Sequence, residues 1–67
     1  MSMTDPVADM LTRLRNASRA KHARVDIPAS KLKREMARVL AETRFIDNFA
    51  FIEDDKQGVL RLYLRYD

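Results

Sequence analysis

Apolar residues recur at helical spacing in two parts of the chain. Asp5 and Pro6 mark the start of the first part, because aspartate can accept free N–H groups of a first helical turn and proline suits the first helical position. Ser30 is a candidate N-cap for the second part. The two apolar stripes predict helices, the first fading near residues 20–22; they are Val7, Met10, Leu11, Leu14 and Ala17, and then Leu32, Met36, Val39 and Leu40.

Extended segments are expected between and after these helices. Pro28 disfavours helical geometry at Ile27, which indicates a short strand at residues 25–28. After residue 44 the apolar period changes to two, and residues 54–58 form a turn ending in the only glycine, so the last two strands should form an antiparallel hairpin. The alternation places these side chains in the core: Phe45, Phe49, Phe51, Leu60, Leu62, Leu64 and Tyr66.

The predicted order is helix, strand, helix, strand, strand. Such an order favours an α+β fold in which two helices pack on one face of a small three-stranded sheet. With 67 residues, the chain is expected to form a single domain over residues 1–67. A domain of this size buries a limited core, which can supply only a few kcal/mol of net stability.

Positive charge is concentrated in the middle of the chain. Residues 10–44 carry ten Lys and Arg against three acids, a balance of +7, whereas the net charge of the whole chain is +3. Residues 45–67 carry three basic and five acidic side chains. A basic block of this kind on a small domain suggests a polyanionic partner, although a solvated helix face would show the same charges.

Most enzyme and metal chemistries lack their usual residues in this sequence. There is no cysteine, one histidine (His22) and one glycine (Gly58), which leaves no thiolate site and no glycine-rich nucleotide loop. Asp54 and Asp55 could suggest a metal-dependent nuclease, but aspartate is common in exposed turns. No apolar run is long enough to span a bilayer. We expect no catalytic residue, metal, cofactor, membrane or small-molecule substrate, and a cytoplasmic protein.

The polar side of the first helix is one candidate RNA-binding surface. It presents Thr12, Arg13 and Asn16. Arginine can neutralise a phosphate, and threonine and asparagine can hydrogen-bond phosphate or sugar oxygens. A solvated helix face is the plainer interpretation, but asparagine lowers helix propensity without an evident packing return.

The start of the second helix is the other candidate. Ser30 is followed by Lys31, Lys33 and Arg34, which oppose the positive end of the helix dipole. Free N–H groups and positive charge at a helix start attract phosphate. Charges that disfavour the helix but suit a phosphate indicate a binding role here.

A protein-interaction surface is the alternative function. Arg61, Tyr63 and Arg65 alternate with the apolar residues of the last strand and so fall on the opposite, open face of the sheet. Tyr63 could stack a nucleic-acid base there, or it could be covered by a protein partner. The second interpretation is favoured because an uncovered sheet face on a small domain suits a neighbouring protein.

Four segments together resemble a known protein family. The run from Thr4 to Ala17 closely resembles the opening of bacterial small-subunit ribosomal protein eight, and residues 27–33 (IPASKLK) match a second recurrent segment of that family. The pair Phe45-Ile46 and the last strand, residues 60–66 (LRLYLRY), also fit. The resemblance covers the chain from its first helix to its last strand.

This resemblance implies a specific function and site. Family members bind the central domain of the 16S ribosomal RNA, help to assemble the small-subunit platform beside neighbouring ribosomal proteins, and can repress their own messenger RNA. Asp5 would also cap its helix. Carried over by position, the RNA contacts of the family fall on Thr4, Asp5, Thr12, Arg13, Asn16, Ser30 and Lys31. The basic start of the second helix adds Arg34 to these candidates.

Two features depart from the family pattern. The family has a second, C-terminal domain with a serine- and threonine-rich RNA-binding loop and a glycine-rich ending, and neither occurs among these residues. The chain is therefore expected to correspond to the N-terminal half. Thr43 and Arg44 stand where the family often has a glycine, which predicts an altered end of the second helix.

Overall fold

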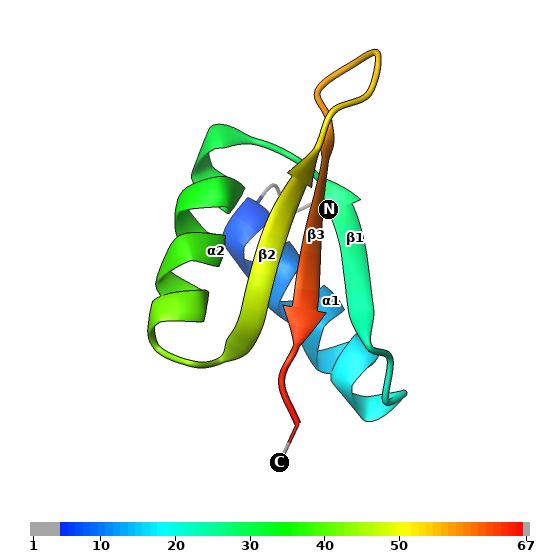
Figure 1. The fold of residues 1–67 in the computed structure, drawn as a ribbon, viewed down its shortest axis with the longest axis vertical. Coiled ribbons are helices and arrows are strands. Elements are labelled where there is room, and N and C mark those ends of the chain that lie inside the picture. Colours follow the sequence, from blue (N-terminus) through cyan, green and yellow to red (C-terminus); the bar gives the residue numbers. More distant parts are fainter. Residues whose placement is uncertain (1–4, 67) are drawn as a thin grey trace.

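The elements follow the predicted order. The computed structural model describes residues 5–66, and Thr4 lies outside them. Its elements, coloured along the chain in Figure 1, are α1 (Pro6–Arg19), β1 (Arg24–Pro28), α2 (Lys31–Glu42), β2 (Ile46–Ile52) and β3 (Val59–Leu64). The predicted α+β fold is confirmed.

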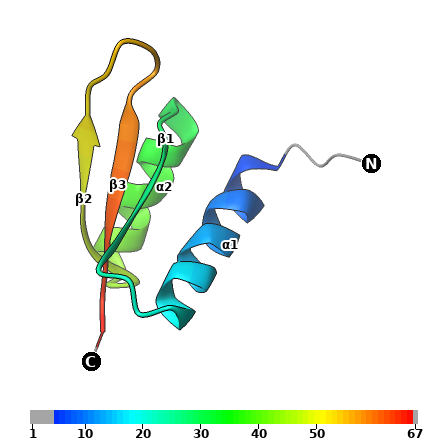
Figure 2. The ribbon, with the colours of Figure 1, turned by 90° about the vertical axis from the view of Figure 1, so that its right-hand side faces the viewer.

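The last strand lies at the centre of the sheet. The strand order is β1-β3-β2, and β3 pairs antiparallel with both neighbours. The predicted hairpin of β2 and β3 is therefore present. Both helices lie on one face of the sheet, as the side view in Figure 2 shows, and the opposite face is open. Both helices also begin at the same end of the molecule, the end that carries the β2–β3 turn (Figures 1 and 2).

The core lies between the helices and the sheet. Leu60, Leu62 and Leu64 of β3 alternate toward the helices and are buried, as predicted. The other strands supply Ile27 and Ile46, and the helices supply Met10, Ala17, Ala37 and Leu40. Among the described residues no polar side chain is buried, which is consistent with a core too small to satisfy one.

Two of the aromatic residues predicted in the core lie outside the strands and are exposed. Phe45 precedes β2 with 74% of its surface exposed, and Tyr66 follows β3 with 41% exposed. A β-bulge between Ile46 and Asn48 is the reason for the first error, because it adds one residue and reverses the alternation. Ile46 therefore faces the helices together with Phe49, and each pairs with a buried leucine of β3.

The helix α2 buries less of its apolar stripe than the sequence suggests. Ala37 and Leu40 are buried, whereas Leu32 is 48% exposed and Val39 is 42% exposed. The apolar stripe is wider than the part of α2 that the sheet covers. The small residue Ala37 therefore packs closest to the sheet, and the residues at the edges of the stripe remain at the surface.

The helix α2 ends in a motif that usually contains glycine, with Arg44 in the glycine position. Arg44 adopts a left-handed backbone with a φ of 69°. The N–H of Phe45 donates to the carbonyl of Leu40 at 2.8 Å, and the N–H of Arg44 donates to Ala41 at 3.2 Å. These bonds form a Schellman motif, which usually has glycine at the left-handed position. Lys21, with a φ of 61°, ends α1 in the same way.

Candidate nucleic-acid interface

The start of α1 is capped by Asp5. Its Oδ1 accepts hydrogen bonds from the N–H groups of Val7 and Ala8, each at 3.1 Å. The capping role predicted for this residue is confirmed, and the carboxylate is already engaged with its own helix. An RNA phosphate would be repelled by this charge, so any RNA contact of Asp5 is expected to involve a donor such as a ribose hydroxyl.

The three polar residues predicted on α1 are all exposed. Thr12 and Asn16 are four residues apart and share one face of the helix, with Arg13 beside them. Arg13 donates from Nε to the Asp9 carboxylate at 3.2 Å, and about half of each side chain is exposed. An exposed pair of this kind contributes little to stability, so Arg13 can exchange Asp9 for a phosphate at low cost.

The start of α2 carries cations and no acid. Ser30 caps the helix, since its Oγ accepts from the N–H of Lys33 at 3.1 Å. The Lys33 ammonium in turn donates to the carbonyl of Pro28 at 3.4 Å. Lys31 and Arg34 are exposed and form no ion pair within residues 5–66. Their charges, together with the free N–H groups of the first turn, make this end of the helix strongly attractive to an anion.

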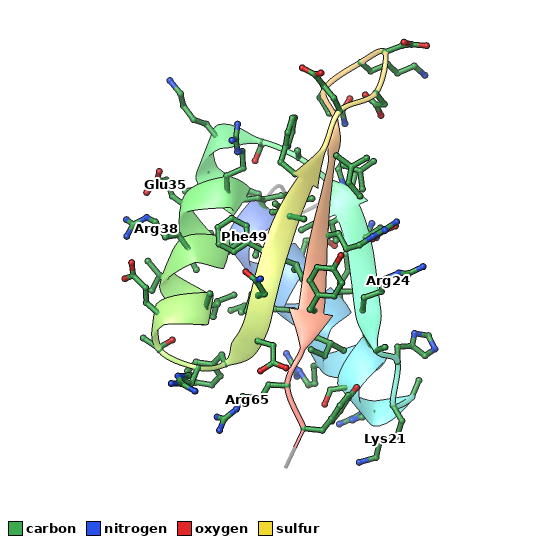
Figure 3. The ribbon with its side chains drawn as sticks, viewed as in Figure 1. Lys21, Arg24, Glu35, Arg38, Phe49 and Arg65 are labelled. Carbon is green, nitrogen blue, oxygen red and sulfur yellow. The ribbon has the colours of Figure 1, made fainter. Side chains whose placement is uncertain are left out.

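Further along α2, one arginine is already paired within its own helix. Arg38, labelled in Figure 3 on the outer side of α2, donates to Glu35 at 3.1 Å and to Glu42 at 2.9 Å. Its charge is therefore balanced within its own helix. The contrast with Lys31 and Arg34 shows that the unpaired charge of α2 is concentrated at its start.

The open face of the sheet holds a cross-strand ion pair. Arg61 donates to both carboxylate oxygens of Asp26, at 2.8 and 3.0 Å. This bidentate hydrogen bond lowers the pKa of Asp26 below its ordinary value. Tyr63 lies on the same face, half-buried, opposite Arg24 and Asn48 of the flanking strands. Arg65 does not join Arg61 and Tyr63, because its guanidinium donates to the carbonyl of Arg44 at 3.2 Å.

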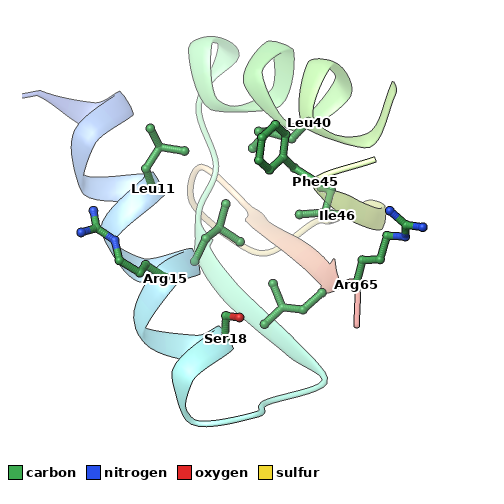
Figure 4. A pocket seen from close by; sticks show the side chains of 9 residues that line it. Leu11, Arg15, Ser18, Leu40, Phe45, Ile46 and Arg65 are labelled. Atoms are coloured by element: carbon green, nitrogen blue, oxygen red, sulfur yellow. The ribbon is translucent and has the colours of Figure 1, made fainter. Parts of the chain in front are cut away.

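A pocket of about 390 Å³ opens between α1 and the end of α2 (Figure 4). Its lining is mainly apolar, with Arg15, Ser18 and Arg65 as its polar members; the apolar members are Leu11, Leu14, Leu40, Phe45, Ile46 and Leu64. An apolar lining of this kind suits hydrophobic groups and offers little to a phosphate. It is a feature that the sequence did not indicate, because Phe45 was assigned to the core.

The aspartates of the β2–β3 turn serve the turn itself. Oδ1 of Asp54 accepts from the N–H groups of Lys56 and Gly58, each at 2.8 Å. Within residues 5–66 no cluster of three or more His, Cys, Asp or Glu side chains is placed to hold a metal ion. None of the helices in that range is long and apolar enough to cross a membrane.

The structure places the starts of the two predicted RNA-binding helices at one end of the molecule. The capped starts of α1 and α2 lie at the same end of the molecule, while Thr12, Arg13 and Asn16 lie further along α1 (Figures 1 and 2). The sequence of the chain also matches a known protein family. The family model described as ribosomal protein S8 matches residues 5–67.

The chain belongs to the ribosomal protein S8 family.

Curated members of the S8 family align along almost the whole chain. The small ribosomal subunit protein uS8 of Staphylococcus aureus, in strains JH9, Newman and JH1, is 56% identical over 66 residues. That alignment covers 98% of this chain and 50% of each relative, so the chain spans about half the length of the relatives it matches. Membership of a ribosomal protein family agrees with the expectation that the chain is not an enzyme.

One residue of β2 lies at the surface beside the start of α2, where the sequence did not predict it. Phe51 was expected in the core, but 38% of its surface is exposed, and the guanidinium carbon of Arg34 lies 4.5 Å from its ring centroid. Alternation along β2 correctly predicts that Phe51 faces the helices. It does not reveal that β2 is an edge strand, where a helix-facing side chain reaches the surface.

Proposed function

We propose that this chain is a structural constituent of the small ribosomal subunit and acts as a single RNA-binding domain over residues 1–67. Its membership of the S8 family supports this role, as do the relatives named as small ribosomal subunit proteins. The protein would work in the cytoplasm, on the ribosome, with ribosomal RNA and neighbouring small-subunit proteins as its partners.

The resemblance noted in the sequence supports a more specific assignment. The chain would bind the central domain of 16S ribosomal RNA and help to assemble the platform of the subunit. The same surface would bind a similar RNA fold in its own messenger RNA and repress translation. Both roles use one recognition surface, because a messenger that imitates the ribosomal fold presents the same phosphates and riboses.

The observation that carries the proposal is the uncompensated positive start of α2. Lys31 and Arg34 form no ion pair within the described residues, and no acid stands in the first turn. In the proposed complex these cations and the free N–H groups hold a backbone phosphate, with the Ser30 hydroxyl at their edge.

The polar side of α1 would supply the second set of contacts. Thr12 and Asn16 would hydrogen-bond phosphate or ribose oxygens, and Arg13 would neutralise a phosphate. Contacts of this type read the shape of folded RNA and carry little base information. Asp5, at the start of α1, would add a further contact, and Thr4 is proposed as an RNA contact from the family resemblance alone.

A salt titration of RNA binding tests the proposal. Lys31→Ala should weaken binding to a fragment of the 16S central domain and reduce the slope of log K against log salt by about one. Arg44→Ala is a matched control, since Arg44 is an exposed cation beyond the opposite end of α2. If Lys31→Ala leaves both affinity and slope unchanged, the start of α2 is not a phosphate site.

An unrelated duplex of equal length distinguishes recognition from simple charge attraction. Preference for the central-domain fragment that persists at moderate salt supports specific recognition by this chain. Equal and strongly salt-dependent binding to both RNAs would contradict it, since nonspecific binding rests almost entirely on counterion release.

The open sheet face favours protein interaction as a second candidate function. No helix within residues 5–66 covers this face (Figure 2), and Arg61 and Tyr63 are half-buried there in a cross-strand group. A neighbouring protein docked on this face would lose affinity on Tyr63→Ala while RNA affinity stayed the same. A loss of RNA affinity from that substitution would instead assign Tyr63 to the RNA surface.

A further inference from the structure

The exposed ring of Phe51 in β2, which lies beside the start of α2, is held in a defined position. The Phe51 ring packs against Gly58, so closely that a Cβ added to the glycine would lie 2.5 Å from two ring atoms. Gly58 has a φ of 93°, a backbone that favours glycine, so the turn both requires this residue and leaves room for the ring. The ring therefore occupies a site formed by the β2–β3 turn.

The guanidinium of Arg34 lies over this ring. Its central carbon is 4.5 Å from the ring centroid, within the range of a cation–π interaction. Arg34 has no competing ion pair within residues 5–66, and the ring restricts its long side chain. The result is an exposed planar cation that is ordered before any ligand arrives, which reduces the entropy lost on binding.

A shallow pocket of about 230 Å³ adjoins this pair. It is lined by Ala29, Ser30, Lys31, Arg34, Phe51 and Gln57. It thus combines a stacking surface, an amide that can donate and accept hydrogen bonds, and a cation suited to a phosphate. These are the groups that a single nucleotide with an unpaired base requires.

We propose that Arg34 and Phe51 form a stacking platform for one unpaired RNA base, whose phosphate lies against Lys31. This proposal rests on the RNA-binding function proposed above and adds a base-stacking contact to a surface that otherwise reads phosphate and ribose. The base stacks on the guanidinium plane, and Gln57 contacts its edge. Every base has a face that can stack, so the platform selects an unstacked nucleotide rather than a particular base.

The test couples protein variants to single RNA changes. In a fragment of the 16S central domain, each unpaired nucleotide is replaced in turn by an abasic nucleotide, and dissociation constants are measured with the 67-residue chain. One position should weaken wild-type binding about fivefold or more, the effect of losing one stacked base. The same replacement should have no further effect on Arg34→Lys, which keeps the charge and lacks the plane.

Three further variants separate stacking from folding and from charge. Phe51→Tyr keeps the ring and should bind as wild type does, whereas Phe51→Leu should lose the same fivefold. Arg38→Lys changes an arginine held by two glutamates and should leave the abasic effect intact. Thermal unfolding of each variant shows whether a loss of affinity accompanies a loss of structure.

The outcomes distinguish this platform from the function on which it rests. Tight, preferential binding of the fragment with no abasic position coupled to Arg34→Lys would overturn the platform and leave the proposed function standing. A wild-type chain that does not prefer the fragment would overturn both. Equal coupling in Arg38→Lys would also overturn the platform, since the effect would then not depend on the guanidinium that lies over Phe51.

Discussion

Replacing Arg44 with glycine should stabilise the fold. Arg44 occupies the left-handed position that ends α2, with a φ of 69°. An L-residue with a side chain loses about 1–2 kcal/mol in this conformation. Glycine avoids that strain but gains about 0.5–1 kcal/mol of conformational entropy in the unfolded chain. The difference predicts that Arg44→Gly raises the free energy of unfolding by about 0.5–1 kcal/mol.

The surroundings of Arg44 support this magnitude. Its side chain forms no hydrogen bond or ion pair within residues 5–66, so removing it costs no polar interaction there. The bond that Arg65 donates reaches the Arg44 carbonyl and would survive the change. The two Schellman hydrogen bonds, from Arg44 and Phe45, also involve backbone atoms alone. The expected gain therefore comes from the backbone conformation.

Thermal and urea unfolding followed by circular dichroism would measure the effect. For a domain of this size the gain should raise the melting temperature by about 2–8 °C. Arg44→Ala is the control, because alanine removes the long side chain and keeps the Cβ that causes the strain. If Arg44→Gly is no more stable than Arg44→Ala, the backbone explanation is refuted.

Three other substitutions test the structure. Gly58→Ala should destabilise by more than about 1 kcal/mol in urea unfolding, since φ is 93° and the added Cβ meets Phe51; equal stability would show that the turn relaxes. Asp5→Asn should keep the α1 cap and its stability, whereas Asp5→Ala should lose about 0.5–2 kcal/mol; a loss of RNA affinity without a loss of stability in Asp5→Asn would assign the carboxylate to binding. Wild type should be more stable than Asp26→Asn at pH 7, because Arg61 lowers the pKa of Asp26 in the folded state. This advantage should vanish as the pH falls below the ordinary aspartate pKa of about 3.9. A stability difference that stays constant in melts from pH 7 to pH 2 would contradict that linkage.

The error at Phe45 shows what a periodic pattern cannot reveal. Phe45 and Phe49 are four residues apart, so a regular strand would place both on one face. The bulge between Ile46 and Asn48 interrupts that regularity, and Ile46 takes the core position instead. The bulge depends on the pairing of β2 with β3, so the β2 sequence alone does not predict it.

The candidate site shows the same division. The exposed polar positions of α1 and the capped, basic start of α2 were predicted from local features, and the structure places each on the surface. The pairing of Arg34 with Phe51 was not predictable, because the two residues come from a helix and a strand that are distant in sequence. Their roles in RNA binding remain predictions.

The sequence by itself determined the order of elements, the two helix starts and the family to which the chain belongs. Caps, prolines and apolar periods act within a few residues, so they can be recognised without knowing where an element will lie. Only the tertiary structure decided that β3 is central, that both helices begin at one end, and that Phe51 reaches the surface. Those features depend on which strand pairs with which and in what register, and such pairing is set by contacts between distant segments of the chain.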